Sequence, residues 1–172
     1  MLRPVIFALF GISSLAAVSS PALAPLATVE YVDIARYAGK WLEVARIPNR
    51  FERRCVRDVT AEYTLEKNTI RVRNSCIQVD GKLRSANGKA LVVDTHSNAK
   101  LKVTFFWPFY GKYWIIGLDP AYRWAVVGEP TRKYLWVLSR TSVLSENERA
   151  EVDRVIKERG YEHASLIWSP SR

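Results

Sequence analysis

The chain has 172 residues, which is enough for one domain with a real hydrophobic core. Because 48% of its residues are hydrophobic and 12% are aromatic, the composition excludes an intrinsically disordered chain. A net charge of +9 suits nucleic acid, an anionic membrane surface or an acidic ligand. The Lys and Arg residues are mostly scattered, without zinc-finger spacing, a helix-turn-helix pattern or an RNA-binding aromatic signature. We therefore expect no nucleic-acid partner.

Residues 1 to 24 have the pattern of a cleaved signal peptide. Arg3 supplies the positive charge, and the apolar run from Val5 to Val18 is too short to span a bilayer comfortably. Small residues such as Ala22 and Ala24 suit cleavage, which would leave residues 25 to 172 as the mature domain. No cysteine precedes Cys55, so we expect no lipidated cysteine. The expected location is the periplasm, with or without association with the outer membrane.

Eight strand-like segments follow one helical turn, which is expected over residues 32 to 37 with Asp33 as its cap. Most segments alternate apolar and polar residues, and short turns join them. The segments span residues 40–47, 56–65, 69–79, 82–94 with an interruption at Asn87-Gly88, 100–107, 113–119, 124–127 and 134–140, with an aromatic loop over 108–111. This up-and-down order predicts an all-β fold, an eight-stranded antiparallel barrel.

A C-terminal helix is expected after the strands. Ser145 is a good N-cap, and Glu148 completes a capping box with it. Val152, with Val155 and Ile156, forms an apolar stripe, so this helix should pack on the outside of the barrel. Gly160 ends the helix, and residues 164 to 168 suit a short final strand.

Cys55 and Cys76 are the only two cysteines, so an exported chain has one disulfide to form. The loop that this bond closes is about twenty residues long and is worth about 3 kcal/mol on the chain-entropy model. In a hairpin that turns near residues 67 and 68, the two cysteines are not direct partners. The bond therefore requires a slipped register, a bulge, or Cys55 in a loop that folds over the next strand.

The alternating strands point a set of large apolar side chains toward the barrel interior. Such side chains either fill a core or line a pocket for one small hydrophobic ligand, and the pattern leaves both open. Asn74 interrupts the apolar face and is either a polar contact for a ligand or a residue near the rim. The set expected to face the ligand is Tyr63, Val72, Val103, Phe105, Trp114 and Trp136, with Ile116 also expected to point inward.

Three residues are candidates for closing one end of the barrel. Gly39 permits a tight bend, and Trp41 is large enough to plug a small barrel. A guanidinium stacks well on an indole, and Arg140, at the end of the last barrel strand, is the best candidate to cap Trp41. The alternative is an ordinary core tryptophan and an ordinary surface arginine.

These motifs, taken in order, resemble the lipocalin family. They are Gly39-x-Trp41, residues 122–127 (YRWAVV) and residues 135–141 (LWVLSRT) before a helix. Residues 37–41, 50–53, 109–111 and 166–168 are similar to bacterial lipocalins of the Blc type, relatives of apolipoprotein D. The resemblance implies a calyx that binds fatty acids or lysophospholipids, with Trp41 and Arg140 closing its base and Trp136 facing the pocket. It also implies membrane anchoring in many Blc-type proteins, for which this chain lacks the cysteine.

The function expected from these features is the binding, storage or transport of lipids in the cell envelope, for membrane maintenance. Arg50, Arg53 and Arg54 form either a basic rim that meets a carboxylate or phosphate head group, or a solvated loop. We expect no enzyme, no cofactor, and a monomer or weak dimer.

Two other functions remain as alternatives. Some lipocalins are isomerases that use a cavity thiol, for which Cys55 would be the candidate. The aromatic segment 106–110 would suit a protein partner, a membrane surface or a gate at the cavity mouth. A metal site is not expected, because His96 and His163 are isolated.

Overall fold

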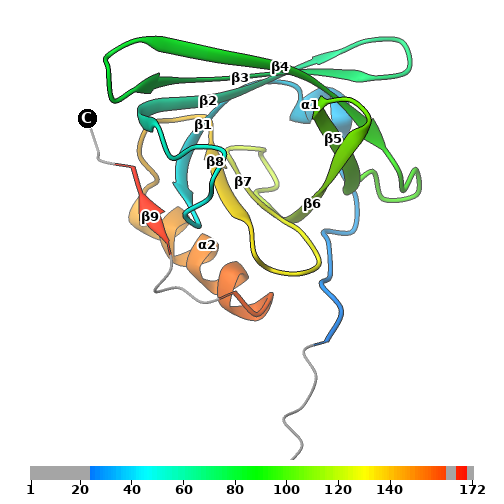
Figure 1. Cartoon of the computed structure of the whole chain (residues 1–172). Coiled ribbons are helices and arrows are strands. Elements are labelled where there is room, and N and C mark those ends of the chain that lie inside the picture. The colour runs from blue at the N-terminus through cyan, green and yellow to red at the C-terminus, as the bar shows by residue number, and fades with distance from the viewer. Residues whose placement is uncertain (1–23, 162–165, 170–172) are drawn as a thin grey trace, which may run out of the picture.

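The computed structural model describes residues 24–161 and 166–169. The expected signal peptide and His163 therefore lie outside the described residues, apart from Ala24. The elements are α1 (Ile34–Tyr37), β1 (Gly39–Arg46), β2 (Cys55–Leu65), β3 (Ile70–Gln78), β4 (Leu83–Val92), β5 (Lys100–Phe106), β6 (Phe109–Leu118), β7 (Trp124–Gly128), β8 (Leu135–Ser139), α2 (Glu146–Glu158) and β9 (Ile167–Trp168). The strands curve into a barrel with α2 outside it (Figure 1).

Strand β1 closes the barrel by pairing on both sides. It is antiparallel to β2 from Gly39 to Leu42 and to β8 from Leu42 to Arg46, while strands β2 to β8 each pair with the next. The short β9 pairs with Ala45 and Arg46, where β2 has already left β1. The predicted fold, a closed eight-stranded antiparallel barrel with one helix outside, is confirmed.

The barrel has two different ends, which we call the base and the mouth. The chain enters at the base through α1, where Asp33 accepts hydrogen bonds from the backbone N–H groups of Ala35 and Arg36 as the predicted cap. The antiparallel order puts the β2–β3, β4–β5 and β6–β7 connections at the base as well. The connections β1–β2, β3–β4, β5–β6 and β7–β8 lie at the mouth.

Two strand boundaries differ from the sequence-based expectation. Strand β4 continues through Asn87 and Gly88, which pair with Arg73 and Val72 of β3. A Cβ at Gly88 would lie 2.5 Å from the backbone oxygen of Thr104 and 2.8 Å from the Phe105 ring, so glycine here permits close approach of the neighbouring strand and its aromatic side chain instead of breaking the strand. The expected aromatic loop at 108–111 is mostly strand, because β6 begins at Phe109.

Helix α2 packs on the outer wall as predicted. Ser145 and Glu148 form the expected capping box, and Val152 and Ile156 are completely buried. They join a hydrophobic cluster with the outward-facing side chains of the barrel, among them Trp124 and Val137. The described residues therefore form two cores, one inside the barrel and one between the barrel and α2.

The disulfide between Cys55 and Cys76 is present, with a Cα–Cα distance of 5.6 Å. Cys55 pairs across the hairpin with Gln78, not with Cys76, and the register shifts twice between Cys55 and Thr60. A bulged strand thus brings the two cysteines together, one of the arrangements that the spacing required.

Trp41 and Arg140 meet at the base. The Trp41 side chain is completely buried, and the Arg140 guanidinium lies 3.7 Å from its ring centroid. Arg140 also donates to the backbone carbonyls of Lys40 at 2.7 Å and Ala38 at 2.9 Å, on either side of Gly39. Gly39 has φ +92°, a conformation that costs a non-glycine residue strain. One guanidinium therefore ties the start of β1 to the end of β8.

Replacing Trp41 with alanine should lower the free energy of unfolding by about 3 to 5 kcal/mol, because it empties a fully buried site. Denaturant unfolding would measure the loss. Trp107→Ala, at a side chain that is 78% exposed, is the matched control and should change stability by less than about 0.5 kcal/mol. Similar losses in the two variants would contradict the role of Trp41 as the plug of the base.

Candidate functional site

The barrel interior holds most of the side chains expected there. Tyr63 and Val72 are directly opposite each other on β2 and β3, and both belong to the inner cluster. Val103 of β5 and Trp136 of β8 pack against this cluster while keeping part of their surface exposed. Four of the six residues expected to face a ligand are thus brought together inside one barrel.

Strand β6 presents to the barrel interior the face opposite to the one expected from the sequence. Its inward residues are Tyr113 and Ile115, whereas Trp114 and Ile116 belong to the outer cluster beneath α2. The expected placement of Trp114 in the interior therefore does not hold; its ring lies under Lys100, at 5.0 Å. The reason is that this strand is apolar on both faces, so alternation did not indicate its inner side, and a shift of one residue reverses every side chain.

Phe105 lies on the inner wall but close to the mouth. The ring approaches the position where Gly88 would carry a Cβ, and Gly88 pairs with the inward-facing Val72. The side chain remains 44% exposed. Phe105 therefore lies at the entrance of the interior.

Three tyrosines form a hydroxyl chain deep in the barrel. The Tyr113 hydroxyl is 2.7 Å from that of Tyr37 and 2.8 Å from that of Tyr63. Burial is the main cause that raises the pKa of Tyr63 to about 12 and those of Tyr37 and Tyr113 well above the usual value. All three are neutral phenols at physiological pH. They border a cavity of about 10 Å³ near the base, roughly the space of one water molecule.

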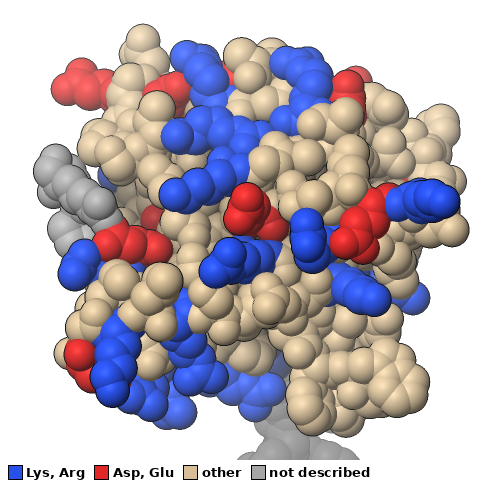
Figure 2. Space-filling view, turned by 90° about the horizontal axis from the view of Figure 1, so that it is seen from above, with Lys and Arg blue, Asp and Glu red and all other residues tan. Residues whose placement is uncertain are grey.

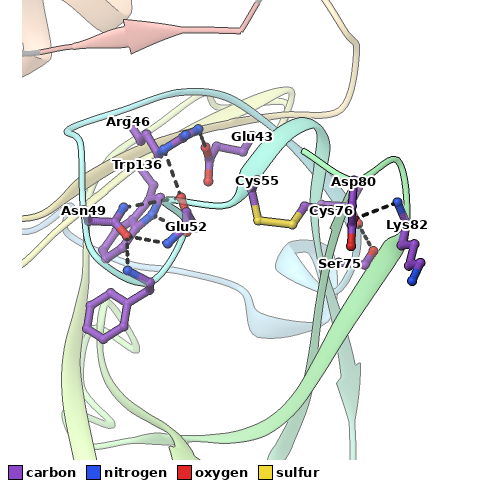
Figure 3. The surroundings of a disulfide bond; sticks show 12 residues. Glu43, Arg46, Asn49, Glu52, Cys55, Ser75, Cys76, Asp80, Lys82 and Trp136 are labelled. Carbon is purple, nitrogen blue, oxygen red and sulfur yellow. Dashed lines mark hydrogen bonds and ion pairs between the residues drawn. A yellow bond between two sulfur atoms is a disulfide. The ribbon is translucent and has the colours of Figure 1, made fainter. Parts of the chain in front are cut away.

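A charged cluster lies on the inner side of β1 and at the mouth. Arg46 donates from Nη1 to Glu43 at 2.8 Å, and its Nε lies 3.2 Å from Glu52. The indole N–H of Trp136 donates to the other oxygen of Glu52 at 3.1 Å, and Asn49 donates to Glu52 at 3.3 Å. Figure 3 shows these side chains pointing toward one another beside the disulfide. The cluster holds the β1–β2 loop against the barrel wall.

Glu43 is the most buried member of this cluster, with 6% of the residue exposed. Burial raises the pKa of Glu43 to about 8, and the nearby Glu52 adds to this, although Arg46 acts in the opposite direction. Sequence reasoning missed Glu43. The available signal was its position two residues after Trp41, since residues two apart on a strand share a face.

Asn74 also faces the interior. It pairs with Ala61, a member of the inner cluster, and its Oδ1 atom is buried without a hydrogen-bond partner. A buried acceptor of this kind calls for a donor from water or a ligand. Among the two readings that the sequence left open, the structure favours Asn74 on the inner wall.

The three arginines expected at the rim lie in the β1–β2 loop or directly before β2, at the mouth. Arg50, Arg53 and Arg54 are exposed, and Arg54 reaches Asp80 at 3.9 Å. His96 lies in the β4–β5 connection at the base. Within residues 24–161 and 166–169, no group of three side chains suited to hold a metal ion occurs.

Comparison with known proteins places these features in one family. A model of the lipocalin-like domain matches residues 32–171. The outer membrane lipoprotein Blc of Citrobacter freundii is 40% identical over 168 residues, which cover 96% of this chain and 94% of that protein. Apolipoprotein D of Macaca fascicularis is 37% identical over 93 residues, or 52% and 48% of the two chains. Insecticyanin from the tobacco hornworm Manduca sexta shares the fold, with a TM-score of 0.70, 22% identity and coverage of 88% and 86%.

The buried Glu43 should make stability fall as the pH rises. Between its usual value of 4.5 and its folded value of about 8, the folded state binds the proton more tightly than the unfolded chain. The unfolding free energy should therefore decrease, relative to Glu43→Gln, from about pH 5 to 8, by an amount on the order of a few kcal/mol.

Thermal melts of the wild-type and Glu43→Gln proteins at pH 5 and pH 8.5 would measure this difference. The expected relative fall in Tm of the wild type is roughly 5 to 10 °C. Glu62→Gln, at an exposed position on β2, is the control and should keep the wild-type slope. A constant difference in Tm between wild type and Glu43→Gln would show that Glu43 titrates normally.

Proposed function

The chain belongs to the lipocalin family, whose members bind small hydrophobic ligands, and on that premise we propose that it carries or stores a fatty acid or lysophospholipid in the cell envelope. The acyl chain would lie inside the barrel, against Tyr63, Val72, Val103, Phe105 and Trp136. Maintenance of the membrane is the task that we infer for such a carrier. Trp114 is left out of this site because it packs on the outer wall.

The observation that carries the proposal is the partial exposure of apolar side chains that point into the barrel. Val103, Tyr113 and Trp136 pack against the inner cluster, yet each keeps accessible surface. The base, by contrast, is sealed by the fully buried Trp41. An acyl chain that entered from the mouth would cover the exposed apolar surface, at about 0.8 kcal/mol per buried CH₂ group. A chain of about twelve carbons would thus supply enough free energy to offset the cost of association.

We propose a binding protein and not an enzyme. The thiol mechanism needs a free, reactive Cys55, but Cys55 is bonded to Cys76. The three buried tyrosine hydroxyls bond to one another, and their raised pKa values make them poor bases at neutral pH. A barrel interior with partly exposed apolar side chains and neutral phenols supports binding of a hydrocarbon.

We also propose export to the periplasm, with residues 1–24 as the cleaved signal peptide. The Citrobacter freundii relative is named an outer membrane lipoprotein, which supports a place in the cell envelope. In the described part of the chain, no helix has the length and apolar character needed to cross a membrane.

A membrane surface is the partner that we propose for the mouth. Phe106, Trp107 and Phe109, at the β5–β6 turn, are 75%, 78% and 72% exposed. Three large exposed rings in one turn form an apolar patch of the kind that marks an interaction surface. The outer faces of the adjacent strands carry basic residues: Arg71 and Arg73 on β3, Lys89 on β4, Lys102 on β5 and Lys112 on β6. Figure 2 looks onto the side of β3 and β4, where Lys and Arg atoms predominate over acidic ones.

Aromatic side chains beside basic ones favour an anionic bilayer surface, since the rings enter the head-group region and the cations meet its charge. This orientation would bring the mouth to the membrane, where a lipid enters or leaves. A monomer suffices for such contact, and a weak dimer is also compatible with it.

Trp136→Ala should weaken binding of a fluorescent long-chain fatty acid by about 10-fold or more, since it removes a large part of the inner wall near the mouth. Fluorescence titration of the delipidated protein would measure the dissociation constant. Trp114→Ala is the matched control, because it removes the same side chain from the outer wall, and should change affinity by less than about 2-fold. Equal losses would contradict the assigned pocket, and absence of saturable binding to the wild type would contradict a carrier.

Replacing Phe106, Trp107 and Phe109 together with serine should abolish co-sedimentation with phosphatidylglycerol vesicles while leaving fatty-acid affinity within about 3-fold. Tyr31→Ser, at an exposed ring before α1 and near the base, is the control and should bind vesicles like the wild type. If the triple variant still sediments with the vesicles, the mouth does not face the membrane. Neutral phosphatidylcholine vesicles should bind less than the anionic ones, since the basic faces need an anionic surface.

A further inference from the structure

The charged cluster at the mouth contains more acceptors than donors. Arg46 directs its Nη1 and Nε groups to Glu43 and Glu52, so its charge is already matched. The indole N–H of Trp136 is used in the same way, on Glu52. Two carboxyl groups therefore share one guanidinium, and the arginine is not a free cation for an anionic ligand.

Another polar group on the inner wall is also a hydrogen-bond acceptor. The Oδ1 atom of Asn74 is a buried acceptor without a partner. In the pairing of β1, β2 and β3, Trp41, Ala61 and Asn74 form one row across the inner wall. Glu43 lies two residues further along β1, toward the mouth. The inner wall, from the row of Trp41 toward the mouth, thus offers oxygen acceptors to a ligand that supplies hydrogen-bond donors.

This arrangement discriminates between head groups. A carboxylate head would bring a further negative charge next to Glu52, and next to Glu43 once that group loses its proton; because these side chains are only 16% and 4% exposed, the repulsion would be poorly screened. An ammonium head would bring three donors and a positive charge that matches the second carboxylate when Glu43 loses its proton. Glu52 belongs to the β1–β2 loop at the mouth, so a head group that follows its tail into the barrel meets Glu52 first.

We propose that Glu43 and Glu52 form a head-group site that selects single-chain amphiphiles with an ammonium group over those with a carboxylate. The inference rests on the proposed lipid-binding function and deepens it by naming the head-group chemistry. The exposed Arg50 and Arg53 lie outside this site and are available for a phosphate, while Arg54 pairs with Asp80. A zwitterionic head group, with its amine inward and its phosphate at the rim, fits both features.

The groups that face Glu43 also predict a pH dependence. They are Arg46 on β1, Glu52 on the loop and Tyr63 on β2. Glu43 holds a proton at pH 7 because its pKa is raised to about 8, and a bound ammonium would replace that proton. Affinity for an amine should therefore rise from pH 6.5 to pH 9, where an alkylamine is still charged.

The test is displacement of a fluorescent fatty-acid probe by dodecylamine, dodecanol and dodecanoate, which share one chain length. At pH 8, dodecylamine should displace the probe at a concentration about 10-fold lower than dodecanoate. Glu43→Gln and Glu52→Gln should each reduce this ratio to within about 2-fold, and the rise of amine affinity with pH should disappear in Glu43→Gln. Glu62→Gln, which makes the same change on the outside of β2, should behave as the wild type.

The outcomes separate the two proposals. Displacement by all three compounds at similar concentrations overturns the head-group site while lipid binding stands. No displacement by any of them, with no binding of the probe, overturns the carrier function and the site with it. An amine preference that persists in both variants also overturns the assignment to Glu43 and Glu52. If Glu43→Gln does not fold, the more exposed Glu52→Gln carries the test.

A final pair of lipids identifies the source of the amine. Lysophosphatidylethanolamine and lysophosphatidylglycerol of one acyl chain differ in the ammonium group and the net charge that it brings. Tighter binding of the ethanolamine lipid, lost in Glu52→Gln, assigns the site to an aminophospholipid. Equal binding of the two lipids, together with a strong preference for dodecylamine, assigns it to a free long-chain amine.

Discussion

Closure of the barrel depends on a single strand. Leu42 of β1 pairs with Thr60 of β2 on one side and with Ser139 of β8 on the other, so the first and last parts of the sheet meet at one residue. Because successive side chains of a strand point to opposite faces, this strand also determines what lines the interior. Trp41 enters the base, and Glu43, two residues on, enters the wall above it.

The base of the barrel is closed, whereas its mouth leaves apolar side chains exposed. At the base, the indole of Trp41 is covered by the Arg140 guanidinium, which also satisfies backbone carbonyls of the entering chain. The cation–π contact and the charge-assisted hydrogen bonds act together there to close the base. At the mouth, apolar side chains stay partly exposed, which is costly without a ligand or a membrane to cover them.

Burying polar groups inside the barrel costs desolvation free energy, so their presence there needs an explanation. A buried carboxyl group such as Glu43 is usually retained only where a partner or a function compensates its desolvation. Arg46 and Glu52 provide part of that compensation and hold the β1–β2 loop in place. The Oδ1 atom of Asn74 has no such compensation among the described residues. Such groups distinguish a binding interior from a simple core.

Much of the fold was predictable from local patterns. The capping box of Ser145 and Glu148, the helical turn capped by Asp33 and the eight strands each leave a signal within a few residues. The pairing of Cys55 with Cys76 followed from their being the only two cysteines, although the bulges that allow it did not. The contact between Trp41 and Arg140 joins residues about a hundred positions apart. Its prediction depended on the resemblance to a family as much as on the chemistry of the two side chains.

The sequence by itself therefore determined the strands, their order, the outer helix and most of the inner face, because alternation states which residues share a face. Only the tertiary structure decided which face of β6 is inside, since Trp114 and Ile116 are as apolar as Tyr113 and Ile115 and have a second core to enter beneath α2. It also decided that Glu43, Arg46 and Glu52 meet. Glu52 lies in the β1–β2 loop, and it reaches Arg46 only because this loop folds back over β1; alternation along a strand does not predict such a contact.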